Sequence, residues 1–154
     1  MQVLRQAALA LAVMATPAAA SGGLECSIKD KSLRFAVNAG VTRGMGSPSF
    51  DFRGKLEVLD KVVALDLRDV TFDGGDRPQY WLDGKELRLL LYKERGADKP
   101  FGSVELEIRT KVAGGNDSGV FRDSYKLSVY DLSGDDSRAG KTTTFAGKVA
   151  CFSG

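Results

Sequence analysis

Residues 104–112 read V-E-L-E-I-R-T-K-V, the cleanest period-two pattern in the chain. Val104, Leu106 and Ile108 alternate with charged residues, as expected of a β-strand that is buried on one face and exposed on the other. The same alternation recurs on both sides of this segment. It places the inward residues of the other expected strands at Leu24, Cys26 and Ile28; Leu33, Phe35 and Val37; Phe50, Phe52, Leu56 and Val58; Val63, Leu65 and Leu67; Leu87, Leu89 and Leu91; Phe121, Tyr125, Leu127 and Val129; and Phe145, Gly147, Val149 and Cys151.

The alternation predicts an all-β fold, because no segment after residue 20 keeps the spacing of an amphipathic helix. Eight strands are expected, or nine if Tyr80-Leu82 forms a short one before the Asp83-Gly84 hairpin turn. Val70 and Phe72 fall out of phase with the residues before them, which indicates a β-bulge or the end of a strand. The fold class is a single antiparallel β-barrel (lipocalin-like) or a two-sheet β-sandwich of 8–9 strands.

Residues 1–20 have the composition of a bacterial-type signal peptide. Arg5 is followed by an apolar run at 7–15 and then by Ala18, Ala19 and Ala20, which is the order of a positive region, an apolar region and a cleavage site. The apolar run is shorter than the roughly 20 residues that a membrane-spanning helix needs. We therefore predict cleavage after Ala20, a single β domain over 21–154 and a soluble product that is periplasmic or secreted.

The two cysteines, Cys26 and Cys151, lie near the two ends of the expected domain. Export to an oxidising compartment favours a disulfide between them over two free thiols. Such a bond requires the first and last strands to lie side by side or face to face.

The composition excludes several kinds of chemistry. The 154 residues include no histidine, so Ser-His-Asp catalysis, Cys-His catalysis and imidazole-ligated zinc are all excluded. The 22 Lys+Arg nearly balance the 20 Asp+Glu, which gives no electrostatic reason to expect nucleic acid as a partner. No catalytic motif stands out, so we favour a protein without enzymatic activity, and we expect no cofactor and no metal site.

The order Ser32-x-x-Phe35-x-Val37, followed by Phe52-x-Gly54-x-Leu56, resembles the periplasmic polyisoprenoid-binding lipocalin-like proteins. The resemblance covers residues 32–56 and implies a barrel, but it assigns no functional residue. A disulfide between Cys26 and Cys151 is not a feature of that family.

The pattern F-x-G-K-[LV] occurs twice, at 52–56 and at 145–149. Glycine weakens a strand, so Gly54 and Gly147 are expected at a bend or beneath an aromatic ring rather than in a duplicated binding element.

Four connections are longer than the others: 39–49, 73–79, 95–100 and 133–141. If nine strands run up and down in order, these four share one rim, where function is most expected. Candidate ligand-binding residues in or beside them are Arg43 and Met45 in a glycine-rich loop, Arg77, and the aromatic pair Tyr80 and Trp81, which could stack on a sugar or another ring.

Two functions fit these observations, and the sequence does not decide between them. The first is binding of a small apolar or amphipathic ligand in the barrel interior. The second is a protein–protein interaction or inhibitor module of the cell envelope that uses a loop rim or an edge strand, with a filled core and an exposed patch at Arg43, Met45, Arg77 and Trp81. The first function predicts a cavity lined by Phe35, Phe52, Leu89, Ile108, Tyr125 and Phe145.

Overall fold

The computed structural model describes residues 21–42, 48–115, 118–133 and 140–154. The expected signal peptide, residues 1–20, lies outside the described residues. The described elements are β1 (Ser21–Lys29), β2 (Leu33–Thr42), β3 (Ser49–Val58), α1 (Leu65–Arg68), β4 (Asp69–Phe72), the 3-10 turn η1 (Gly74–Asp76), β5 (Gln79–Leu82), β6 (Glu86–Glu94), β7 (Gly102–Val112), β8 (Val120–Asp131) and β9 (Lys141–Ser153).

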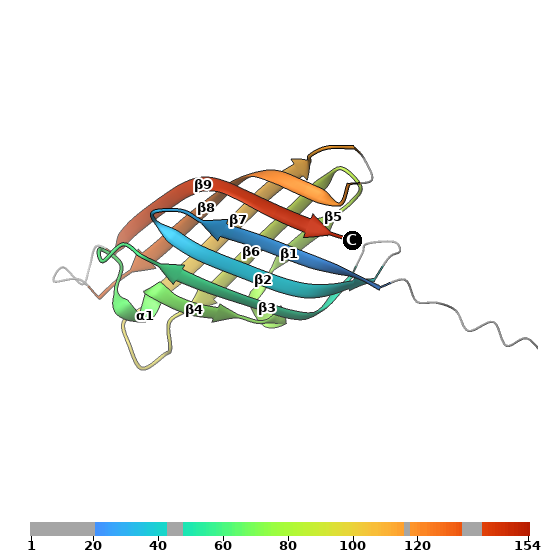
Figure 1. Ribbon diagram of the computed structural model, residues 1–154. Helices are drawn as coiled ribbons and strands as arrows, with labels where there is room; N and C mark the ends of the chain where they lie inside the picture. Colours follow the sequence, from blue (N-terminus) through green and yellow to red (C-terminus); the bar gives the residue numbers. More distant parts are fainter. Residues whose placement is uncertain (1–20, 43–47, 116–117, 134–139) are drawn as a thin grey trace, which may run out of the picture.

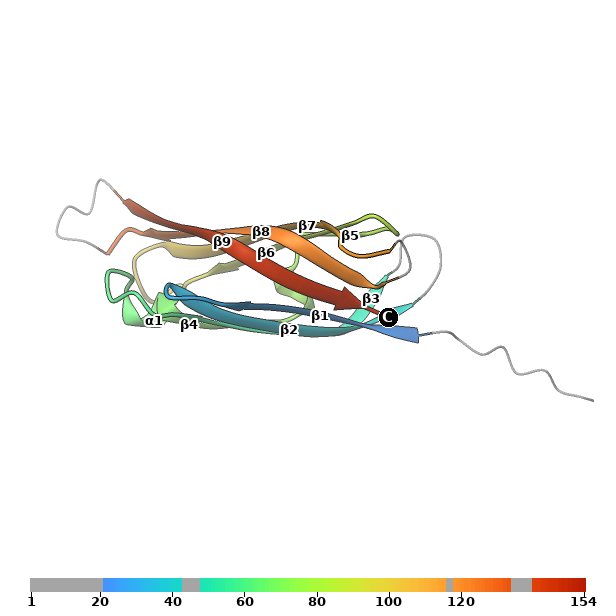
Figure 2. The ribbon, with the colours of Figure 1, turned by 45° about the horizontal axis from the view of Figure 1, so that its top comes forward.

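All nine strands belong to one antiparallel sheet in the order β4-β3-β2-β1-β9-β8-β7-β6-β5. The sheet curls on itself, so that β1–β4 form one layer and β5–β9 form the layer that faces it (Figures 1 and 2). The expected all-β fold is confirmed, as a half-barrel in which the outermost strands β4 and β5 do not pair with each other. No helix among the described residues is long and apolar enough to cross a membrane.

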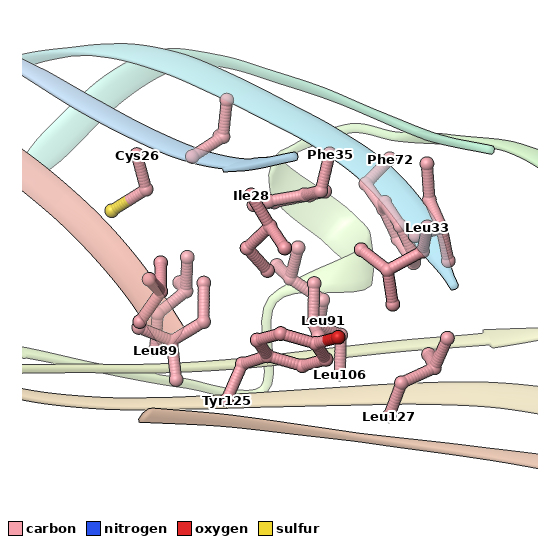
Figure 3. Close-up of a cluster of buried hydrophobic side chains, with 14 of the residues drawn as sticks. Cys26, Ile28, Leu33, Phe35, Phe72, Leu89, Leu91, Leu106, Tyr125 and Leu127 are labelled. Carbon is pink, nitrogen blue, oxygen red and sulfur yellow. The ribbon is translucent and has the colours of Figure 1, made fainter. Parts of the chain in front are cut away.

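One apolar core fills the space between the two layers, as the alternating sequence pattern requires (Figure 3). Cys26, Ile28 and Phe35 point inward from β1 and β2 toward side chains of β6, β7 and β8. The largest fully buried side chains are Leu24, Leu33, Leu56, Leu87, Leu89, Leu91, Leu106, Ile108, Leu127, Val37 and Val104. Burial of this apolar surface is the main force that holds the layers together.

Five of the six side chains expected to line an interior cavity belong to this packed core. Phe35, Phe52, Leu89, Ile108 and Tyr125 are each 5% exposed or less, and Phe145 packs against them partly buried. A side chain that lined an open cavity would be accessible to water, and these five are almost fully inaccessible. The cavity expected along them is therefore filled in the part of the chain that the structure describes.

The expected strand at Val63, Leu65 and Leu67 is wrong, because this segment enters the one-turn helix α1. Within α1, Leu67 is buried whereas Leu65 is 76% exposed, and Val63, which is also buried, lies before the helix begins. The phase change at Val70 follows from the same helix, since β4 starts only at Asp69.

The bulge lies in β3 instead, at Asp51. The register shifts between Asn38 and Gly40 of β2, and Asp51 adopts a φ of 49°. This bulge turns Phe50 to the outer face, where its ring lies over Gly40, while Phe52 points into the core. The expectation that Phe50 and Phe52 share a face is therefore wrong.

We predict that Asp51→Val lowers the free energy of unfolding by about 1–2 kcal/mol, because a β-branched residue is strained in the left-handed region. Asp51→Gly should be neutral or stabilising by up to about 1 kcal/mol. Arg53→Val is the matched control, since Arg53 is also exposed on β3 but has no positive φ. Urea unfolding of the three variants checks this, and an unchanged Asp51→Val would contradict it.

Both glycines of the repeated F-x-G-K-[LV] pattern lie beneath aromatic rings, as expected. The ring of Tyr125 covers Gly147, and Phe72 packs closely on Gly54. The Tyr125 hydroxyl also donates to Asp30 Oδ2 (2.5 Å). Burial raises the pKa of Asp30, but this hydrogen bond and two backbone N–H donors outweigh burial, so the pKa lies below its usual value.

The disulfide between Cys26 and Cys151 is confirmed, with an S–S distance of 2.07 Å. The two cysteines are direct cross-strand partners on β1 and β9, so the first and last strands lie side by side. Both side chains point into the core and are almost fully buried.

Candidate functional site

The β4–β5 connection changes the direction of the second half of the chain. Eight antiparallel pairings separate β4 from β5 in the sheet, so these two strands run the same way. The segment 73–78, which contains η1, therefore crosses from one edge of the sheet to the other instead of turning back beside β4.

This crossing makes the expected rim of four long loops wrong. The β6–β7 and β8–β9 connections begin at the end of the sheet that carries α1, whereas β2 ends and β3 begins at the opposite end (Figure 1). Because β4 and β5 run the same way, every connection after residues 73–78 lies at the opposite end of the sheet from the one expected. No pattern in the sequence indicates this change.

Side chains bridge the gap at the unpaired edges of the sheet, with β3 and β4 on one side and β5 and β6 on the other. Lys93 of β6 donates from Nζ to the Thr71 carbonyl of β4 (2.8 Å) and pairs with Asp76 of η1 (2.8 Å). Farther along, the Arg77 guanidinium lies 5.2 Å from the ring centre of Phe52 and 5.1 Å from that of Tyr80. The two sides of the gap are thus joined by two cations and their polar or aromatic partners rather than by a backbone ladder.

The structure brings Arg77 and Tyr80 together, two of the five predicted ligand-binding residues, but turns them toward the interior. Arg77 Nε, Arg77 Nη1 and the Tyr80 hydroxyl are buried and have no hydrogen-bond partner in the described chain. Burial raises the pKa of Tyr80 to about 12. Trp81 points to the opposite, outer face, so the aromatic pair is split; Arg43 and Met45 lie outside the described residues.

A shallow depression of about 650 Å³ lies on the outer face of β5, β6 and β7. Trp81, the only tryptophan of the chain, forms one wall and is 57% exposed. Its indole Nε1 donates to Asp83 Oδ2 (3.3 Å), a carboxylate that also accepts the backbone N–H groups of Lys85 and Glu86. The β5–β6 turn therefore fixes the aromatic wall.

Sheet register places two arginines in line with Trp81 across β6 and β7. Arg88 is the direct cross-strand partner of Trp81, and Arg109 is the partner of Arg88. Each arginine pairs with a glutamate two residues earlier on its own strand, Arg88 Nη2 with Glu86 Oε2 at 2.6 Å and Arg109 Nε with Glu107 Oε1 at 2.6 Å. Sequence analysis missed these four residues, although the repeated E-x-R spacing at 86–88 and 107–109 is visible in the sequence.

A second polar cluster lies near α1, centred on Arg95, whose side chain is 4% exposed. Arg95 Nη1 donates to Asp131 Oδ1 (2.9 Å) and to the Pro100 carbonyl (3.0 Å), and Nη2 donates to Asp66 Oδ1 (3.2 Å). Hydrogen bonding from Arg95 lowers the pKa of Asp131 to about 2. Because α1 follows β3 and Asp131 ends β8, this cluster ties the two layers together and has a structural role.

The described residues contain no group of three or more Cys, Asp or Glu arranged to hold a metal ion. No protein-family model, curated protein or solved structure matches this chain. The resemblance over residues 32–56 therefore finds no support in these comparisons.

Proposed function

We propose that this protein is an exported, non-catalytic binding domain that holds an amphipathic ligand on the outer face of β5–β7, around Trp81. The observation that carries the proposal is the coincidence of the depression with the chain's only tryptophan and two arginine–glutamate pairs. Convergent polar groups beside an aromatic surface are what a small-molecule site needs for orientation and affinity.

Other parts of the molecule support this location over the interior. The core is packed along the residues that a buried ligand would have to touch. The outermost strands β4 and β5 have only four residues each, which makes them poor templates for an added strand.

The leader-like residues 1–20 and the disulfide fit an oxidising compartment outside the cytoplasm.

We expect Trp81→Ala to weaken ligand binding by about tenfold or more, since an indole wall supplies most of the apolar contact. Isothermal titration with cellotetraose, maltotetraose, N-acetylchitotetraose, trigalacturonate, phenylalanine and cholate tests this. Leu65→Ala is the matched control, because Leu65 is an exposed apolar residue on α1, away from the depression. The proposal fails if no compound binds the wild type, or if Trp81→Ala binds as the control does.

A further inference from the structure

The outer-face depression combines a flat apolar wall with a line of hydrogen-bonding groups. Trp81, Arg88 and Arg109 are consecutive cross-strand partners on β5, β6 and β7. Neighbouring strands lie about 4.8 Å apart, so the three side chains extend over about 10 Å of the surface. The site is therefore an open strip that suits an extended ligand with a repeated structure.

The polar groups of the strip are paired with each other but retain free hydrogen-bonding capacity. Among described residues, the Arg88 side chain donates only to Glu86, and that of Arg109 only to Glu107. A guanidinium has five N–H donors, and a carboxylate accepts several hydrogen bonds, so both pairs can still bind neighbouring hydroxyl groups. Adjacent donors and acceptors are what vicinal hydroxyls on a ring require.

The charge of the strip argues against an anionic ligand. Asp83, Glu86 and Glu107 contribute three negative charges, and Arg88 and Arg109 contribute two positive ones. Each guanidinium already faces a carboxylate at 2.6 Å or less, so a phosphate or uronate would have to displace that partner. A neutral polyhydroxylated ring has no such requirement.

We propose that the ligand of this surface is a neutral oligosaccharide, whose C–H face stacks on Trp81 while its hydroxyls bind the Glu86–Arg88 and Glu107–Arg109 pairs. This inference rests on the proposed function and names its ligand class. The site is open and solvated, so we expect dissociation constants in the range of about 0.1–10 mM.

Intrinsic fluorescence tests the inference directly, because Trp81 is the only tryptophan. We expect at least one of cellotetraose, maltotetraose and N-acetylchitotetraose to change the emission saturably. Arg88→Ala and Glu107→Gln should each weaken this binding by about threefold to tenfold. Arg34→Ala is the matched control, since Arg34 pairs with Glu57 on the outer face of β2 and should leave affinity unchanged.

The outcomes separate this inference from the proposed function. Binding of cholate, phenylalanine or trigalacturonate that depends on Trp81, with no response to any neutral glycan, overturns the saccharide inference and leaves the proposed function standing. Neutral-glycan binding that Arg88→Ala and Glu107→Gln leave unchanged also overturns the inference, because the polar pairs would then have no part in recognition. Failure of every compound overturns both.

Discussion

Replacing Cys26 and Cys151 together by alanine is expected to lower the free energy of unfolding by about 3–5 kcal/mol. The cysteines are 125 residues apart in sequence, so the bond restricts almost the whole unfolded chain. In the chain-entropy description, a disulfide that closes a loop of this length stabilises the folded protein by about 5 kcal/mol. Strain or residual structure in the unfolded chain reduces the measured value.

The position of the disulfide adds a structural reason for this large effect. The two layers are joined through β1 and β9, which form only four cross-strand residue pairs. The neighbouring strands β8 and β9 form twelve. The Cys26–Cys151 pair lies within that short junction. We therefore expect the amides of β1 and β9 at the junction to lose protection from hydrogen exchange first when the bond is removed.

Urea unfolding of the oxidised wild type, the reduced wild type and the double alanine variant provides the measurement. The reduced protein and the double variant should agree, and reductant should not affect the double variant. If the free energy of unfolding of the reduced protein were within about 1 kcal/mol of that of the oxidised protein, the β1–β9 junction would be stable without the bond, which would contradict this prediction.

Arg95→Met should lower the free energy of unfolding at pH 7 by about 2–3 kcal/mol. Removing one partner from a fully buried ion pair costs roughly 3–5 kcal/mol, and the partial exposure of Asp66 and Asp131 reduces that value. Lys55→Met is the control, because the Lys55–Asp69 pair is well exposed on both sides and its loss should cost under about 1 kcal/mol.

The Arg95 effect should also depend on pH in a defined direction. The pKa of Asp131 is about 2 in the folded protein, against 3.8 for the free side chain. A lowered carboxyl pKa stabilises the folded state fully above the unfolded pKa, and the stabilisation is lost as the pH falls through the folded pKa. The difference between wild type and Arg95→Met should therefore shrink between about pH 4 and pH 2. A difference that stays constant over this range would mean that Arg95 acts through packing alone.

Strand content and the disulfide could be predicted from the sequence because both depend on local or covalent features. Period-two alternation identifies the half-buried strands, and two cysteines allow one pairing. The short segment 63–67 shows where this reasoning fails: Val63, Leu65 and Leu67 alternate as in a strand, yet a one-turn helix begins at Leu65. The Asp51 bulge could not be located from the sequence, because most Asp residues do not adopt a positive φ even though Asp adopts it more often than most residues.

The candidate site was only half predictable for a topological reason. Trp81 was a candidate on residue type, and its exposure agrees with a surface role. Arg88 becomes a neighbour of Trp81, and Arg109 a neighbour of Arg88, only through the β5–β6 and β6–β7 registers. Alternation along one strand says which face a residue occupies but does not give the partner strand. The grouping of Tyr80 with Trp81 failed because consecutive strand residues point to opposite faces.

Mapping ligand contacts by NMR tests most directly whether this protein binds on its outer face rather than in its interior. Amide and methyl shifts would be followed while the wild type is titrated with each compound of the panel. We expect saturable changes at Trp81, at Arg88 and at Arg109, with the methyl groups of core residues such as Leu24 and Leu127 unchanged. Changes centred on those core methyl groups, or no saturable change with any compound, would contradict the account.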